Sequence, residues 1–174
     1  MNDKMLKFYK QTSLYTDLGL YRDFARQLTN DIDELCILQR MQIIHPVAYD
    51  NSEIRKQSKC FWGDMTKVPI TRLDYEDDLF PTALSMLHEL LRKDNKYHID
   101  REAQNKIHVT CRGQSILLAS ILKAKGYSAR VRSGFAPYIK YDGVAYDHWI
   151  TEYYDENKKR WILVDADEHC PDHK

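Results

Sequence analysis

The feature that most constrains this chain is a helical stretch, residues 110–126, that begins near a cysteine. Polar residues fill its first turn, and apolar residues follow at the spacing of a helix face. Lys123 and Lys125 suit the negative end of a helix dipole, and Gly126 after them is typical of a helix C-terminus. The pattern therefore predicts a helix that begins at or next to Cys111, where unpaired backbone N–H groups favour a thiolate over a thiol.

The four cysteines are expected to be reduced thiols. They stand at positions 36, 60, 111 and 170 without a CxxC pair, and residues 1–7 lack the apolar stretch of a signal peptide. Widely spaced cysteines in such a chain are typical of the cytoplasm, which is the predicted compartment. A free cysteine is most often a small buried hydrophobic residue, so its partners must decide whether Cys111 is reactive.

Composition excludes several classes of partner. The 174 residues include 26 Lys and Arg and 26 Asp and Glu, so the formal net charge is zero. A balanced charge argues against broad electrostatic binding to nucleic acid or to an anionic membrane. No apolar run approaches the length of a membrane span. The length suits one domain with a sizeable core, and the oligomeric state is left open.

The N-terminal part is predicted to be mainly helical. Residues 1–28 favour short helices or turns, and the cap and acidic residues at 29–34 begin a longer helix. We expect that helix to continue through Ile43 and Ile44 until Pro46 ends it, because the residue before a proline is pushed away from helical geometry.

A second helix is expected to begin at Phe80-Pro81, because proline is tolerated in the first turn. Its apolar face is formed by Leu84, Leu87, Leu90 and Leu91. Residues 50–72 are predicted to be irregular, and residues 95–109 to form a polar connector that leads to Cys111.

After Gly126 the pattern changes from helical to extended. The predicted elements are a strand at 129–136 ended by Pro137, a turn at 141–143, a strand at 148–154, a polar loop at 155–159 and a strand at 160–165. Two strands joined by a short polar loop should pair antiparallel. Helices followed by such a sheet predict an α+β fold.

Three residues that carry chemistry follow one another in this part of the chain. Cys111 begins a helix, His148 begins a strand and Asp165 ends the next strand. In an antiparallel hairpin the start of one strand lies beside the end of the other, so His148 and Asp165 are expected to touch. An imidazole can take the thiol proton, and a carboxylate orients the imidazole. Asp167 is the rival carboxylate, because two residues further on it would lie on the same face.

The ordered set resembles the transglutaminase-like superfamily over about residues 105–167. The matching residues are Cys111; Gly126, Ala129, Arg130 and Gly134; Asp147, His148, Trp149 and Glu152; and Arg160, Trp161, Val164 and Asp165. Residues 35–46 also look like the helical N-terminal part of a bacterial branch. The resemblance implies a papain-like fold, with the cysteine helix packed on the antiparallel sheet, and a Cys111-His148-Asp165 triad. It implies one domain, 1–174, with a helical part at 1–94, a catalytic core at 95–167 and a tail at 168–174.

The function implied by the resemblance is that of a cysteine hydrolase or acyltransferase with a thioester intermediate. Its substrate would be a peptide, a protein or a small amide, with no cofactor, no nucleic acid and no membrane, and hydrolysis is preferred to crosslinking. One alternative is a binding module that keeps the fold without catalysis. Another is a zinc protein that uses potential ligands near the C-terminus, namely Asp165, Asp167, His169, Cys170, Asp172 and His173.

A side-chain donor for the oxyanion is also implied, usually a Trp or Gln upstream of the cysteine. The candidates are Gln39, Gln42, Trp62 and Gln104, and the sequence does not choose among them. Aromatic residues before the histidine strand, Tyr138, Tyr141 and Tyr146, could border a cleft or lie in an exposed loop.

Overall fold

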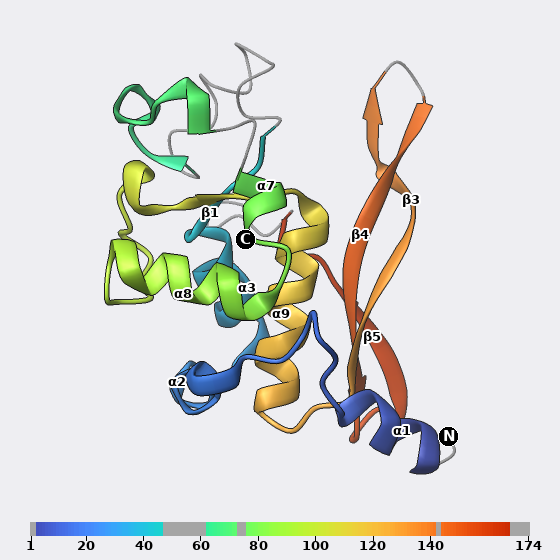
Figure 1. Cartoon of the computed structure of the whole chain (residues 1–174). Coiled ribbons are helices and arrows are strands. Elements are labelled where there is room, and N and C mark those ends of the chain that lie inside the picture. The colour runs from blue at the N-terminus through green and yellow to red at the C-terminus, as the bar shows by residue number, and fades with distance from the viewer. Residues whose placement is uncertain (1–2, 47–61, 73–75, 142–143, 168–174) are drawn as a thin grey trace.

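The computed structural model describes residues 3–46, 62–72, 76–141 and 144–167. Its elements in chain order are α1 (Asp3–Lys10), η1 (Gly19–Tyr21), α2 (Arg22–Gln27), α3 (Ile32–Arg40), β1 (Ile43–Ile44), η2 (Met65–Lys67), η3 (Ile70–Arg72), α7 (Glu76–Leu79), α8 (Ala83–Lys93), η4 (Ala103–Asn105), β2 (Ile107–His108), α9 (Cys111–Ala124), β3 (Ala129–Tyr141), β4 (Val144–Asp155) and β5 (Arg160–Val164). Helices α2, α3 and α8 lie on one side of α9, and the sheet of β3, β4 and β5 stands on the other (Figure 1). The predicted α+β fold is therefore confirmed.

The sheet has the predicted antiparallel hairpin at its C-terminal edge. Its strand order is β3-β4-β5, and Thr151 of β4 lies opposite Val164 of β5. Strand β3 does not end at Pro137 as predicted, but continues to residue 141. A register shift between Ala136 and Lys140 interrupts its pairing with β4. Such an irregularity accommodates a residue that cannot donate a ladder hydrogen bond.

Helix α9 forms the centre of the core, and every residue from 113 to 122 is buried. The helix closes as predicted at Gly126, whose φ is +92°. The N–H of Gly126 donates to the Lys123 oxygen at 2.9 Å, and the N–H of Tyr127 donates to the Leu122 oxygen at 3.0 Å. This pair of bonds is how a left-handed glycine terminates a helix.

The helix predicted for residues 29–46 is shorter than expected and ends at Arg40. Ile43 and Ile44 instead form strand β1, which pairs in parallel with β2. Both isoleucines are fully buried, and β-branched side chains fit a strand well. The Val109 N–H donates to the Ile44 oxygen at 3.2 Å. The chain that leaves β1 therefore runs beside the chain that enters α9.

The predicted polar connector, residues 95–109, contains η4 and β2 and is partly buried. Arg101 and Lys106 are only 3% and 1% exposed. The Arg101 guanidinium donates to the Leu90 oxygen at 2.8 Å and to the Asn105 oxygen at 3.0 Å. Carbonyls at the C-terminal end of α8 carry partial negative charge, so they stabilise this buried cation.

Helix α8 begins later than residues 80–81, because a capping box defines its first turn. Thr82 accepts a hydrogen bond from the Ser85 N–H, and the Ser85 side chain accepts one from the Thr82 N–H. This start places Met86 on the fully buried face and leaves Leu84 38% exposed. Helix α7 was not predicted.

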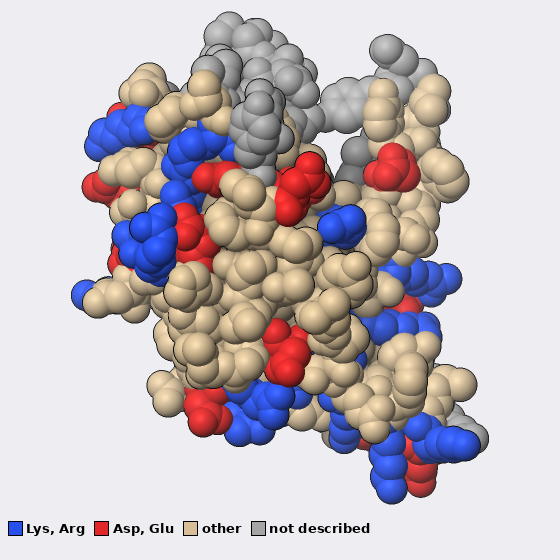
Figure 2. All heavy atoms as spheres, in the orientation of Figure 1, with Lys and Arg blue, Asp and Glu red and all other residues tan. Residues whose placement is uncertain are grey.

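Two further expectations concern the surface. No helix in the described ranges is long and apolar enough to cross a lipid bilayer. Basic and acidic side chains are interspersed around a mainly uncharged central area of the face seen in Figure 2. Residues 142–143 of the predicted turn and residues 50–61 of the predicted irregular stretch lie outside the described residues.

Candidate active site

Cys111 is the first residue of α9, with extended Thr110 as the N-cap. The first hydrogen bond within the helix comes from the Gln114 N–H, which donates to the Thr110 oxygen at 3.1 Å. Helix geometry leaves the N–H groups of the preceding residues without intrahelical acceptors. Asp77 fixes the N-cap, because its carboxylate accepts from the Thr110 N–H at 2.7 Å. The cysteine therefore lies at the positive end of a firmly placed helix.

His148 and Asp165 lie together at the end of the β4–β5 hairpin, as the sequence predicts. The His148 Nε2 is 2.7 Å from the Asp165 Oδ2, and His148 is only 6% exposed. The Tyr138 hydroxyl donates to the same carboxylate oxygen at 2.7 Å, and the Asp167 N–H donates to Oδ1 at 3.0 Å. The Asp165 side chain is thus held by three donors, and the second ring nitrogen of His148 remains for the thiol.

Cys111 receives hydrogen bonds from two histidine side chains and one backbone group. Burial raises its pKa, but hydrogen bonds from His148, His45 and the Trp149 N–H lower the pKa to about 7. Burial lowers the pKa of His148, but its hydrogen bonds with Asp165 and Cys111 raise that pKa to about 10. Between these two values the favoured state is a thiolate paired with an imidazolium.

Cys36 provides a contrast within the same protein. It lies in α3 and is fully buried. Burial, together with the charges of nearby carboxylates, raises the pKa of its thiol to about 12. Cys60 and Cys170 lie outside the described residues.

The second histidine, His45, was not predicted to be part of the site. It follows β1 directly, and its Nε2 is 3.7 Å from the Asp167 Oδ2. Burial lowers the pKa of His45, but the hydrogen bond with Cys111 and the charges of Asp167 and the thiolate raise it, and the net shift is upward. The sequence offered His45 only as the residue before a proline.

The predicted oxyanion donors make other contacts. The Gln39 amide donates to the Gln114 oxygen, the Gln42 amide to the His98 oxygen and the Gln104 amide to Glu102. Trp62 packs in a separate small cluster with Ile44, Val68 and Ala103. Among the described residues of the N-terminal part, the His45 side chain makes a hydrogen bond with Cys111.

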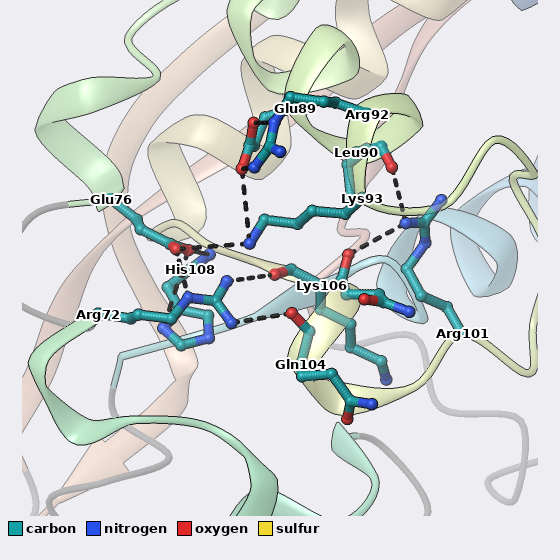
Figure 3. A network of polar contacts seen from close by, with 11 residues as sticks. Arg72, Glu76, Glu89, Leu90, Arg92, Lys93, Arg101, Gln104, Lys106 and His108 are labelled. Carbon is teal, nitrogen blue, oxygen red and sulfur yellow. Dashed lines mark hydrogen bonds and ion pairs between the residues drawn. The ribbon is translucent and has the colours of Figure 1, made fainter.

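A buried polar network holds β2, the strand that leads to Cys111 (Figure 3). Glu76 of α7 accepts a hydrogen bond from the His108 N–H at 2.8 Å and another from the Arg72 Nε at 2.7 Å. The Arg72 guanidinium also donates to the oxygens of Gln104 and Lys106, each at 2.9 Å. The network therefore ties η3, α7 and the connector into one unit behind the cysteine.

A cavity of about 610 Å³ lies between the N-terminal segment, α9 and the sheet. Arg112 and Trp149, which directly follow Cys111 and His148, line part of it. Residues 8–16, α9 and β3 supply the rest of its lining. Cys111, His148 and Asp165 are not among the residues that line it.

The zinc alternative gains no support from the described part of the chain. No group of three or more His, Cys, Asp or Glu side chains that could hold a metal is present among the described residues. Asp165 and Asp167 contact two different histidines. The remaining tail residues of that hypothesis, His169, Cys170, Asp172 and His173, lie outside the described residues, as does the Tyr141 side chain.

Comparison with known proteins agrees with the resemblance seen in the sequence. Residues 88–166 match the family model described as the transglutaminase-like superfamily. The match includes Cys111, His148 and Asp165, and it includes neither His45 nor Asp167. No curated protein and no solved structure matches the chain.

Proposed function

Because residues 88–166 carry a domain of the transglutaminase-like superfamily, we propose that this chain is a cysteine hydrolase or acyltransferase. It acts on an amide or peptide bond through Cys111, His148 and Asp165. One observation carries this proposal: His148 bonds the Cys111 thiol and, through Nε2, the Asp165 carboxylate at 2.7 Å. A thiol, an imidazole and a carboxylate in series are the groups that covalent acyl transfer requires.

The proposed reaction begins when the Cys111 thiolate attacks the carbonyl carbon of the substrate. A C–S bond forms, and the carbonyl π electrons move to oxygen, where backbone N–H groups at the start of α9 can stabilise the charge. The His148 imidazolium gives its proton to the leaving nitrogen as the C–N bond breaks, and a thioester remains. Water or an amine then gives a proton to His148 and attacks the thioester, and the thiolate leaves.

We propose hydrolysis as the second half of the reaction, with the 1–174 chain acting as one papain-like domain in the cytoplasm. The cavity between the N-terminal segment, α9 and the sheet would hold the apolar part of a peptide, protein or small amide substrate. Arg112 and Trp149, which line this cavity, directly follow Cys111 and His148 in the chain. No step of this reaction needs a cofactor.

Selective alkylation tests the proposal directly. Folded protein is treated briefly with iodoacetamide near neutral pH, and the labelled cysteines are identified by peptide mapping. Cys111 is expected to react first, because its pKa is about 7, whereas the pKa of buried Cys36 is about 12. Cys111→Ala should abolish the fast adduct, and Cys36→Ala should keep it.

Turnover is then measured on a peptide and amide library, with Cys111→Ala as the blank. Cleavage that disappears in this variant supports a hydrolase. If Cys111 labels no faster than Cys36 in the folded protein, the nucleophile is not activated and the non-catalytic binding module becomes the better interpretation.

A further inference from the structure

We propose that His45 is a second catalytic histidine, whose ring N–H donates to the oxyanion formed when Cys111 attacks a carbonyl carbon. Asp167 is its positioning residue. This inference rests on the proposed function and deepens it, because it assigns the oxyanion donor of the same reaction. The observation behind it is that two imidazoles, those of His148 and His45, both bond the Cys111 thiol, and that each imidazole lies beside a different carboxylate.

The backbone places His45 beside the nucleophile. Strand β1 pairs in parallel with β2, with Ile44 opposite His108. Parallel strands leave a sheet at the same edge, so His45 and Val109 emerge together. Two residues after Val109, Cys111 begins α9. His45 directly follows β1, whereas His148 belongs to β4. Figure 1 shows β1 on the helical side of α9 and β4 in the sheet on the other side.

The surroundings of His45 suit a donor of hydrogen bonds. The Asp167 Oδ2 lies 3.7 Å from the His45 Nε2. The Cys111 sulfur makes a hydrogen bond with the His45 ring. Both negative charges favour the protonated ring, while burial and the Arg40 guanidinium oppose it. A protonated imidazole donates from both nitrogens and has no lone pair to act as a base. His148, bonded to Asp165, already supplies the base.

The movement of charge in the reaction gives this donor its role. Before the reaction the negative charge is on the Cys111 sulfur, which accepts a hydrogen bond from His45. When the C–S bond forms, the charge passes to the carbonyl oxygen of the substrate, next to the sulfur. A cation that already faces the sulfur can follow the charge without rearrangement, which is the condition for strong electrostatic stabilisation.

Asp167 is held rigidly enough to position a ring. Its Oδ1 is 3.1 Å from the Arg40 Nη1 and accepts from the Gln114 Nε2 at 2.5 Å. Arg40 ends α3 and Gln114 lies one turn after Cys111 in α9. The carboxylate side chain is only 11% exposed. It thus connects both helices to the segment after β5 and presents its second oxygen to His45.

Two reactions of the Cys111 thiol distinguish a donor to the oxyanion from a residue that only changes the ionisation of the thiol. Acylation by p-nitrophenyl acetate builds an oxyanion, whereas alkylation by iodoacetamide displaces iodide at a saturated carbon and builds none. Both rates are measured for wild type, His45→Ala and His45→Gln on the high-pH plateau, where each thiol is fully ionised. Cys111→Ala gives the background.

His45→Ala should lower plateau acylation by about 100-fold, the loss seen on removing one oxyanion donor, and leave plateau alkylation nearly unchanged. His45→Gln should recover most of the acylation rate, because its amide N–H can still donate. Asp167→Asn should lower the pH at which acylation declines, because His45 then loses its proton more easily, with no such change in alkylation.

Equal losses of acylation and alkylation, or no loss of either on the plateau, would overturn the role of His45. A wild-type protein that is alkylated at Cys111 but forms no acyl-enzyme with the ester would overturn the proposed function and this inference with it. Thermal unfolding reports whether each variant is folded. If His45→Ala is not, His45→Gln is compared with His45→Asn, whose shorter amide should fail to restore acylation.

Discussion

At the scale of the residue, two aspartates two positions apart contact two different histidines. Asp165 accepts from His148, and Asp167 lies beside His45. The sequence presented the two carboxylates as rivals for one role, because both could lie on the same face of a strand. The chain leaves β5 at Val164, so strand alternation no longer governs them. Each carboxylate therefore has its own imidazole.

The pH dependence of the thiol follows from these contacts. The thiolate is lost as pH falls through the Cys111 pKa of about 7, and the imidazolium is lost as pH rises through the His148 pKa of about 10. The rate of alkylation at Cys111 should therefore rise through about pH 7, and acyl transfer from an amide, whose leaving nitrogen takes the His148 proton, should fall near pH 10. Mass spectrometry of iodoacetamide adducts against pH measures the first limb. Cys36 is the internal control, and a Cys111 midpoint near 9 would contradict the ion pair.

Asp165→Asn should raise the apparent pKa of the Cys111 thiol. The carboxylate supports the charged ring of His148, and an amide of the same shape removes that charge. The same change in serine triads costs about four orders of magnitude in turnover, and a preformed ion pair should lose less. Iodoacetamide rates against pH measure the shift.

Tyr138→Phe is the matched control for Asp165→Asn, because it removes one hydrogen bond to Asp165 and keeps the charge. It should shift the thiol pKa by less. Equal shifts of the thiol pKa in both variants would mean that the charge of the Asp165 carboxylate does not stabilise the thiolate and imidazolium pair.

At the scale of the element, the sequence predicted those helices and strands that are determined by interactions between residues close together in the chain. Helix α9 and the β4–β5 hairpin follow from capping, periodicity and a short loop, so the Cys111, His148 and Asp165 neighbourhood could be predicted. Strand β1 could not, because two isoleucines after a helix become a strand only through pairing with β2, more than sixty residues later. His45 was missed for the same reason.

The end of α9 gives a test of one element alone. Gly126 has φ +92°, and a Cβ atom added there would meet nothing within 4 Å. Gly126→Val should therefore destabilise the fold through the backbone alone, by about 1 kcal/mol or more. Urea unfolding measures the change. Gly126→Asn is the control, because Asn tolerates the left-handed region better, and equal losses in both variants would contradict the backbone explanation.

At the scale of the whole molecule, the site joins parts that are distant in sequence. His45 comes from β1, Cys111 from α9 and His148 from β4, so their alignment depends on how the layers pack. The polar network of Figure 3 secures the helical side of this arrangement, because it binds α7 and η3 to β2. The thiol is thus sensitive to residues that do not touch it.

Arg72→Ala tests this dependence. The Arg72 side chain is 19% exposed and pairs with Glu76, which is 9% exposed. Among the described residues, removal of Arg72 leaves Glu76 with only Lys93, 4.0 Å away, as a cationic partner, so the free energy of unfolding should fall by about 3 kcal/mol. Alkylation of Cys111 should slow as well, because β2 leads into α9. Arg92→Ala, whose side chain is 61% exposed, should change neither quantity. If urea unfolding and alkylation of Arg72→Ala match the wild type, the network does not hold the nucleophile in place.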